Sequence, residues 1–153
     1  MQRKITVTAG LVSLMMTMLV QNTMAHDKKD QILSAGAGKV DVFKVHCPAP
    51  TVRLQFAVRD QFPGIGFITA LVTKDNAATS YTDQTGGDLS PREFSQDPAD
   101  SINLFKGAGD YMVYVSRTDT TGITAYDLYW HCRRPNGTEH NGSGEIITVI
   151  QDD

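Results

Sequence analysis

Short stretches in which apolar and polar residues alternate recur along the chain, and they limit its fold more than any other feature. The clearest stretch is TVRLQFAVRD at residues 51–60, where the apolar residues stand at positions 52, 54, 56 and 58. Successive side chains of a strand point to opposite faces, so this pattern predicts a strand that is buried on one face. Similar strands are predicted at residues 39–47, 66–75, 80–83, 101–107, 109–117, 123–132 and 145–151.

Seven or eight short strands with no helical periodicity after residue 25 predict an all-β protein. Such strands bury their apolar faces by stacking two sheets, so the expected fold is an antiparallel β-sandwich, either Ig-like or jelly-roll, over residues 39–153. The preceding segment 26–38, HDKKDQILSAGAG, has no apolar face. It is predicted to be an N-terminal arm, either mobile or leading into an edge strand.

The first 25 residues have the features of a secretory signal peptide. Arg3 and Lys4 precede an uncharged stretch at residues 5–20, and Thr23 and Ala25 occupy the −3 and −1 positions of a cleavage site. A membrane-spanning helix would need about 20 apolar residues, more than this stretch supplies. We therefore expect cleavage after Ala25 and export to a periplasmic or extracellular location, with no membrane attachment afterwards.

The charge of the exported chain limits its partners. The full chain has 14 Lys and Arg against 17 Asp and Glu, and the leader removes two basic residues and no acidic one, which leaves a net charge of −5. Nucleic acids and anionic membranes bind concentrated positive charge, so neither is an expected partner. The expected partner is an extracytoplasmic ligand or protein that the sequence does not identify.

The chain contains two cysteines, Cys47 and Cys132, and each follows a histidine. Two cysteines in an exported protein predict a disulfide, because that environment is oxidising. A structural zinc site would instead require four ligands at short spacings. If both cysteines point into the core, alternation places His46 and His131 on the opposite faces of their strands, toward solvent. The two histidines would share a face only if their strands were neighbours in one sheet.

The leader also suggests a copper site. Cleavage after Ala25 would make His26 the N-terminal residue. Its amine and imidazole could then chelate Cu(II), with a further imidazole from His46, His131 or His140. At this one residue the chain resembles secreted copper enzymes and periplasmic copper carriers that use an N-terminal histidine. The competing interpretation is an ordinary residue after a leader.

A glycine-rich acidic stretch, DQTGGD, raises the hypothesis of a calcium site. It carries Asp83 and Asp88, and calcium prefers oxygen ligands from clustered loop carboxylates. The stretch lacks the ligand pattern of an EF-hand. Asp-Gly sequences also form plain turns, so a turn without a metal is the alternative.

The segment RRPNGTEHNGSGE at residues 133–145 predicts a long polar hairpin that could bind a ligand. Its candidate binding residues are Arg133, Arg134, Glu139 and His140, since loops on a rigid scaffold often carry recognition residues. Its two Asn-Gly pairs are equally typical of simple hairpin turns.

Three segments in order resemble the bacterial pre-peptidase C-terminal domain and related Ig-like or jelly-roll sandwiches. They are FKVHCPAPTVRLQFAV, KGAGDYMVYVSR and AYDLYWHC, within residues 39–132. The similar positions are a G-x-Y-x-V-x-V strand at Gly109, Tyr111, Val113 and Val115, followed by a Y-x-L strand at Tyr126 and Leu128. The resemblance implies an accessory domain of a secreted enzyme, involved in binding a substrate or surface or in maturation. The cysteine pair is a departure from that family.

Motifs of several enzyme classes are absent from the sequence, which has no GxSxG, HExxH, CxxC or phosphate-binding glycine loop. We therefore predict an exported, soluble, non-enzymatic binding or interaction module without a cofactor. The first alternative is a periplasmic copper-binding protein that uses His26. The second is a secreted enzyme whose site is assembled from residues far apart in the sequence.

Overall fold

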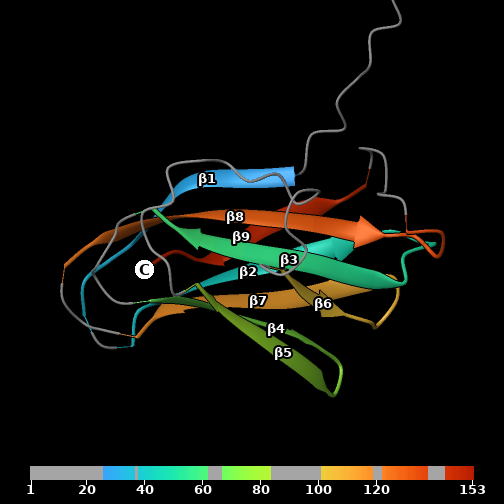
Figure 1. Cartoon of the computed structure of the whole chain (residues 1–153), viewed down its shortest axis with the longest axis horizontal. Coiled ribbons are helices and arrows are strands. Elements are labelled where there is room, and N and C mark those ends of the chain that lie inside the picture. The colour runs from blue at the N-terminus through green and yellow to red at the C-terminus, as the bar shows by residue number, and fades with distance from the viewer. Residues whose placement is uncertain (1–25, 37, 62–66, 84–100, 119–121, 138–143) are drawn as a thin grey trace, which may run out of the picture.

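The computed structural model describes residues 26–36, 38–61, 67–83, 101–118, 122–137 and 144–153, so the predicted signal peptide lies outside it. The described residues form strands arranged in two facing sheets (Figure 1). No helix in this part of the chain could cross a membrane. The strands are β1 (His26–Leu33), β2 (Val40–Cys47), β3 (Arg53–Asp60), β4 (Ile68–Lys74), β5 (Ala77–Asp83), β6 (Ile102–Leu104), β7 (Gly109–Arg117), β8 (Thr124–Arg133) and β9 (Ile146–Gln151).

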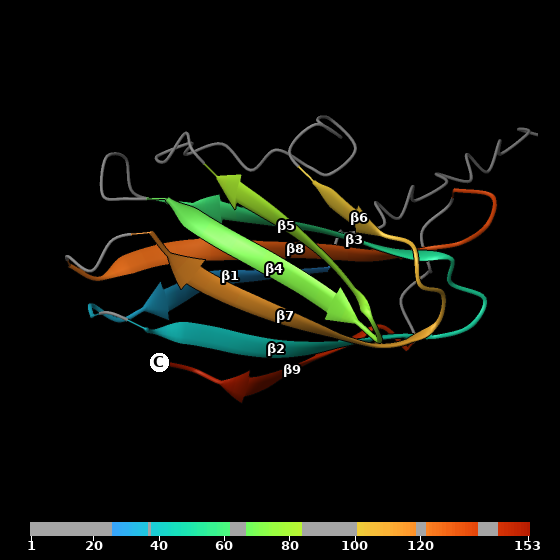
Figure 2. The same ribbon diagram turned by 90° about the horizontal axis from the view of Figure 1, so that it is seen from below.

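The strand order confirms the predicted antiparallel sandwich. Sheet A has the order β1-β8-β3-β6, and sheet B has the order β5-β4-β7-β2-β9. The chain changes sheet at every connection except the β4–β5 hairpin. The first eight strands therefore have the arrangement of a jelly roll rather than that of an Ig domain. β9 adds a fifth strand to sheet B beside β2, as Figure 2 shows.

Nine strands are present in the described residues, against the seven or eight expected, and the additional one is β1. This strand lies in the segment 26–38 and pairs with β8 along the edge of sheet A. Its register shifts between Lys28 and Gln31, and Asp30 has a positive φ of 54°. A bulge interrupts the two-residue alternation, which explains why this strand has no regular apolar face in the sequence.

The core lies between the two sheets and consists of the residues that alternation placed inward. On β3 these are Leu54, Phe56 and Val58, each at most 3% exposed. Burial of each such side chain contributes about 1.5–3 kcal/mol. They pack in one cluster with Phe43, Val45, Ile68, Ala70, Val72, Tyr111, Val113, Val115, Tyr126, Leu128 and Trp130.

A buried carboxylate fastens the C-terminus to both sheets. Asp41 of β2 points inward, where it accepts hydrogen bonds from the Tyr126 hydroxyl of β8 and, at 2.8 Å, from the backbone N–H of Asp153. The carbonyl of Asp153 in turn accepts the N–H of Ser34 at 2.9 Å. Burial raises the pKa of Asp41, although these hydrogen bonds act in the opposite direction. The end of β9 is thus held in a fixed position.

Candidate functional site

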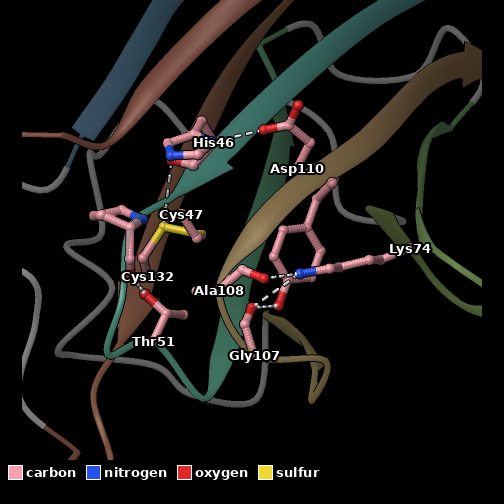
Figure 3. The surroundings of a disulfide bond; sticks show 10 residues. His46, Cys47, Thr51, Lys74, Gly107, Ala108, Asp110 and Cys132 are labelled. Atoms are coloured by element: carbon pink, nitrogen blue, oxygen red, sulfur yellow. Dashed lines mark hydrogen bonds and ion pairs between the residues drawn. A yellow bond between two sulfur atoms is a disulfide. The ribbon is translucent and has the colours of Figure 1, made fainter.

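The predicted disulfide is present and joins the two sheets. Cys47 ends β2 in sheet B and Cys132 lies near the end of β8 in sheet A, with their Cα atoms 5.5 Å apart. Both cysteines are completely buried. Figure 3 shows the bond below His46, which points away from it toward Asp110.

His46 forms a surface hydrogen bond with Asp110. Its Nδ1 lies 2.6 Å from Oδ1 of Asp110, and Nζ of Lys44 lies 3.7 Å from the other carboxylate oxygen. The hydrogen bond from His46 lowers the pKa of Asp110, and Lys44 adds to this effect. A catalytic triad would require a nucleophile bonded to the imidazole. The His46 side chain has no serine, threonine or cysteine as a hydrogen-bond partner in the described part of the chain.

The prediction that His131 faces solvent is wrong, because this residue is only 2% exposed. Alternation placed it correctly on the outer face of sheet A, as the inward positions of Trp130 and Cys132 show. However, β8 lies between β1 and β3 in the sheet. Gln55 of β3, the register partner of His131, is also buried. Asp127 and Tyr129, on the same face of β8, are at most 7% exposed. The outer face of this strand is therefore a buried polar layer.

His46 and His131, two of the four histidines of the copper hypothesis, lie on different sheets. His46 lies on the outer face of sheet B and His131 on the outer face of sheet A, and stacked sheets are about 10 Å apart. One ion cannot contact both. His26 begins β1, and His140 lies outside the described residues. Across the described ranges no three or more His, Cys, Asp or Glu side chains are grouped as a metal site.

Asp83, one of the two calcium candidates, has a structural role. It is 5% exposed, and its Oδ2 accepts the backbone N–H of Asp60 at 2.8 Å, which links the ends of β5 and β3. Asp60 is buried as well, and its Oδ1 accepts the Thr124 hydroxyl at 3.1 Å. The second candidate, Asp88, lies outside the described residues.

A positive φ explains the glycine of the G-x-Y-x-V-x-V strand, and a lysine packs against this position. Nζ of Lys74 donates hydrogen bonds to the carbonyl oxygens of Gly107 and Ala108 and lies 4.5 Å from the ring centre of Tyr111 (Figure 3). A Cβ on Gly109, whose φ is 115°, would stand 3.0 Å from this Nζ. The motif thus serves packing at this end of the sandwich.

Three side chains form a row across the outer face of sheet A. They are Phe105, which directly follows β6, Arg53 of β3 and Arg133 of β8. Arg53 and Arg133 are direct register partners. The guanidinium carbon of Arg53 lies 5.1 Å from the ring centre of Phe105, which is 64% exposed. A cation is therefore stacked on an aromatic ring that remains open to solvent.

A second row fixes the first in position. Gln55 is the register partner of both Asn103 and His131. Its side-chain oxygen accepts a hydrogen bond from Nε of Arg133 at 2.6 Å, and its amide nitrogen donates to the Ser101 hydroxyl at 2.9 Å. We call these two rows the Arg53 face. It consists of Arg53, Gln55, Asn103, Phe105, His131 and Arg133.

The positive charge of Arg53 is not neutralised by any carboxylate of the described residues. This guanidinium has no ion pair with any acidic residue of the described ranges, and its Nε is buried without a hydrogen-bond partner there. Arg133 lies directly opposite Arg53, and an anion bound at Arg53 would offset the repulsion between these like charges. A planar guanidinium suits a carboxylate, which it can bind through two parallel hydrogen bonds.

The sequence located this region only in part. Of the four binding residues proposed for segment 133–145, Arg133 lies on the Arg53 face and Arg134 directly follows β8. Glu139 and His140 lie outside the described residues. Arg53 and Phe105 were missed, because their proximity depends on which strands are neighbours in the sheet. The one available signal was the alternation that pointed Arg53 outward.

No protein-family model, curated protein or solved structure matches the chain. The resemblance to the pre-peptidase C-terminal domain therefore remains a prediction.

Proposed function

We propose that the protein is an exported, non-enzymatic binding module that holds an acidic saccharide on the Arg53 face. The observation that carries this proposal is the guanidinium of Arg53, which is stacked on the exposed ring of Phe105 and has no acidic partner in the described residues. An exposed aromatic ring offers an apolar surface against which a sugar ring can pack. The adjacent guanidinium would bind the carboxylate of that sugar.

The surroundings of Arg53 favour an acidic saccharide over other anions. The half-buried side-chain amide of Asn103 lies in the adjoining row, where it can meet a sugar hydroxyl. The exported chain has a net charge of −5, so the paired arginines are a local positive site on an acidic protein. Such a site selects one charged group of a ligand and would not attract nucleic acid.

We expect uronic-acid oligosaccharides to bind the exported form in titration calorimetry, and neutral glucan oligomers of the same length to bind at least tenfold more weakly. Arg53→Ala removes a charge-assisted hydrogen bond of about 1.5–3 kcal/mol, which corresponds to a loss of affinity of about ten- to a hundredfold. Phe105→Ala should also weaken binding by about tenfold. Arg53→Lys should fall between Arg53→Ala and the wild type, because lysine keeps the charge but lacks the planar fork.

Lys44→Ala is the matched control, since it removes one positive charge from the outer face of sheet B. It should leave the affinity unchanged. Equal binding of neutral and acidic oligomers would contradict the role given to the arginines. A loss in Lys44→Ala as large as that in Arg53→Ala would contradict the location. If no uronic-acid oligosaccharide binds, the proposal fails.

One observation also favours a second function, copper binding by the mature N-terminus. The β1–β8 register places His26 opposite Trp130, the residue before His131. Cleavage after Ala25 would therefore leave the new amine beside the segment of β8 that carries His131. The strand pairing thus brings His26 near the backbone of His131, whereas His46 belongs to the other sheet.

A chain that starts at His26 is expected to bind one Cu(II) tightly, because an N-terminal amine and imidazole form a chelate. One additional alanine before His26 should abolish this binding, as should acetylation of the amine. His131→Ala should weaken it, and His46→Ala serves as the control that should not. Competition titration with a copper chelator measures each affinity. Unchanged copper binding by the extended chain would rule out the N-terminal site.

A further inference from the structure

The edge of sheet B that is formed by β9 is unusually apolar. Strand β9, Ile146–Gln151, lies outside β2 and contains no charged residue (Figure 2). Three of its large apolar side chains are strongly exposed: Ile146 at 57%, Val149 at 40% and Ile150 at 54%. An exposed apolar edge strand presents unpaired backbone groups that can pair with another strand.

The other three sheet edges differ from β9 in features that bear on such pairing. Strand β1 has charged side chains, a bulge and a residue with positive φ, Asp30. Strand β6 has three residues only. Strand β5 exposes none of the large apolar side chains that are open to solvent in the described residues. Charges, a bulge or short length oppose association of β1 and β6, and among the four edge strands β9 exposes three large apolar side chains, whereas β1 exposes one and β5 and β6 expose none.

β9 is already held in the conformation that a partner strand would need. Its residues Ile146–Val149 pair with β2, and the side chain of Gln151 donates to the Val40 carbonyl at 3.1 Å. Beyond the strand, Asp153 is fixed by Asp41 and Ser34. Pairing along the outer edge would therefore cost little additional ordering of the backbone.

We propose that two copies of the protein associate through β9, which pairs antiparallel with the partner's β9 about a two-fold axis at Thr148. This register follows from the directions in which the side chains of β9 point. Ile147 and Val149 lie opposite Val45 and Phe43, which point into the core, whereas Thr148 lies opposite Lys44, which points outward. Residues directly opposite each other in a sheet share a face. A two-fold axis at Thr148 sets Ile147 against the partner's Val149 and Thr148 against the partner's Thr148.

This register makes β9 complementary to itself. Within the regular stretch, Ile147 and Val149 each gain an apolar neighbour, and Ile146 lies toward the partner's Ile150 at the end of this stretch. Glu145 falls opposite the partner's Gln151, and no acidic residue meets another. The bulge at Ile150 leaves Ile146–Val149 regular. A contact in which the same surface of each copy meets itself closes as a dimer.

The dimer goes beyond the proposed saccharide binding and is independent of it. It would join two five-stranded sheets into one continuous sheet, and it uses none of the residues of the Arg53 face, which belong to sheet A and its margin. Two such faces in one particle would raise the apparent affinity for a polymer with repeated acidic groups.

Analytical ultracentrifugation of the exported chain at about 100 μM, which populates contacts with micromolar dissociation constants, should show a dimer. Thr148→Lys and Thr148→Glu each place like charges directly opposite at the axis, and each variant should sediment as a monomer. An equimolar mixture of the two variants should recover the dimer, since lysine then meets glutamate. Ser80→Lys, on the exposed opposite edge of the same sheet, should remain dimeric.

Thr148 and Ser80 are exposed, so none of these variants should lose the fold, and circular dichroism will verify this. A monomeric wild-type chain at the same concentration would overturn the proposal, even if β9 then accepted a strand of another protein. A Thr148→Lys variant that remains dimeric would overturn it too. The same holds if the mixture of oppositely charged variants stays monomeric.

Discussion

Loss of the Cys47–Cys132 bond is expected to lower the free energy of unfolding by about 4–5 kcal/mol, because the bond closes a loop with a sequence separation of 85 residues. The cross-link restricts the unfolded chain, and the restriction grows with the logarithm of the loop length. It also joins β2 to β8 and hence sheet B to sheet A. Urea unfolding of the oxidised and reduced wild-type protein measures the difference, and the melting temperature should fall by about 10–20 °C.

A double variant, Cys47→Ala with Cys132→Ala, separates two contributions. Reduction keeps both sulfur atoms in the core, whereas the double variant also removes buried volume, so it should be less stable than the reduced wild-type protein. The dependence of unfolding on urea should steepen in both, since the unfolded chain exposes more surface without the bond. Equal midpoints for the oxidised and reduced protein would show that the bond contributes nothing to stability.

The two-residue alternation predicted the strands and their inward faces because one buried face is enough to impose that period. Leu54, Phe56 and Val58 are the best example, and the inward cysteines follow from the same rule. Alternation did not predict β1 as a strand, because its bulge breaks the two-residue period and its charges are typical of an edge. Alternation also specifies only the side to which a residue points. His131 points outward and is nonetheless buried, because β8 has neighbours on both edges.

The candidate site could not be predicted from sequence because it depends on the order of strands in a sheet. The pairing of Arg53 with Arg133 and the contact of Arg53 with Phe105 join β3 to strands that are distant in the chain. The hypothesis that His46 and His131 share a face of one sheet is wrong for the same reason. His46 and His131 occupy similar His-Cys sequences, but a jelly roll places β2 and β8 in different sheets. Only the long-range topology distinguishes these outcomes.

Substitution of Asp127 by alanine should cost about 3–5 kcal/mol, because this carboxylate is the centre of a buried polar cluster. Asp127 is 1% exposed and accepts hydrogen bonds from the backbone N–H of Asp30 at 3.0 Å and from Gln61 at 2.6 Å. It also accepts the Tyr129 hydroxyl at 3.3 Å and pairs with Arg59, whose side chain is 18% exposed. Burial, with a further contribution from the charge of Asp127, raises the pKa of Tyr129 to about 12. Removal of the carboxylate leaves the partly buried Arg59 and several donors without this partner.

Urea unfolding should therefore separate Asp127→Ala sharply from Asp27→Ala, an exposed residue of β1 whose ion pair with Lys29 contributes no more than about 1 kcal/mol. Amide exchange in β1 should also accelerate in Asp127→Ala, because the N–H of Asp30 loses its acceptor. The double variant Arg59→Met with Asp127→Leu removes both charges and should be more stable than Asp127→Ala alone. If both single aspartate variants unfold at the same urea concentration, the cluster does not stabilise β1. A double variant less stable than Asp127→Ala would instead assign the loss to packing and not to the unpaired charge.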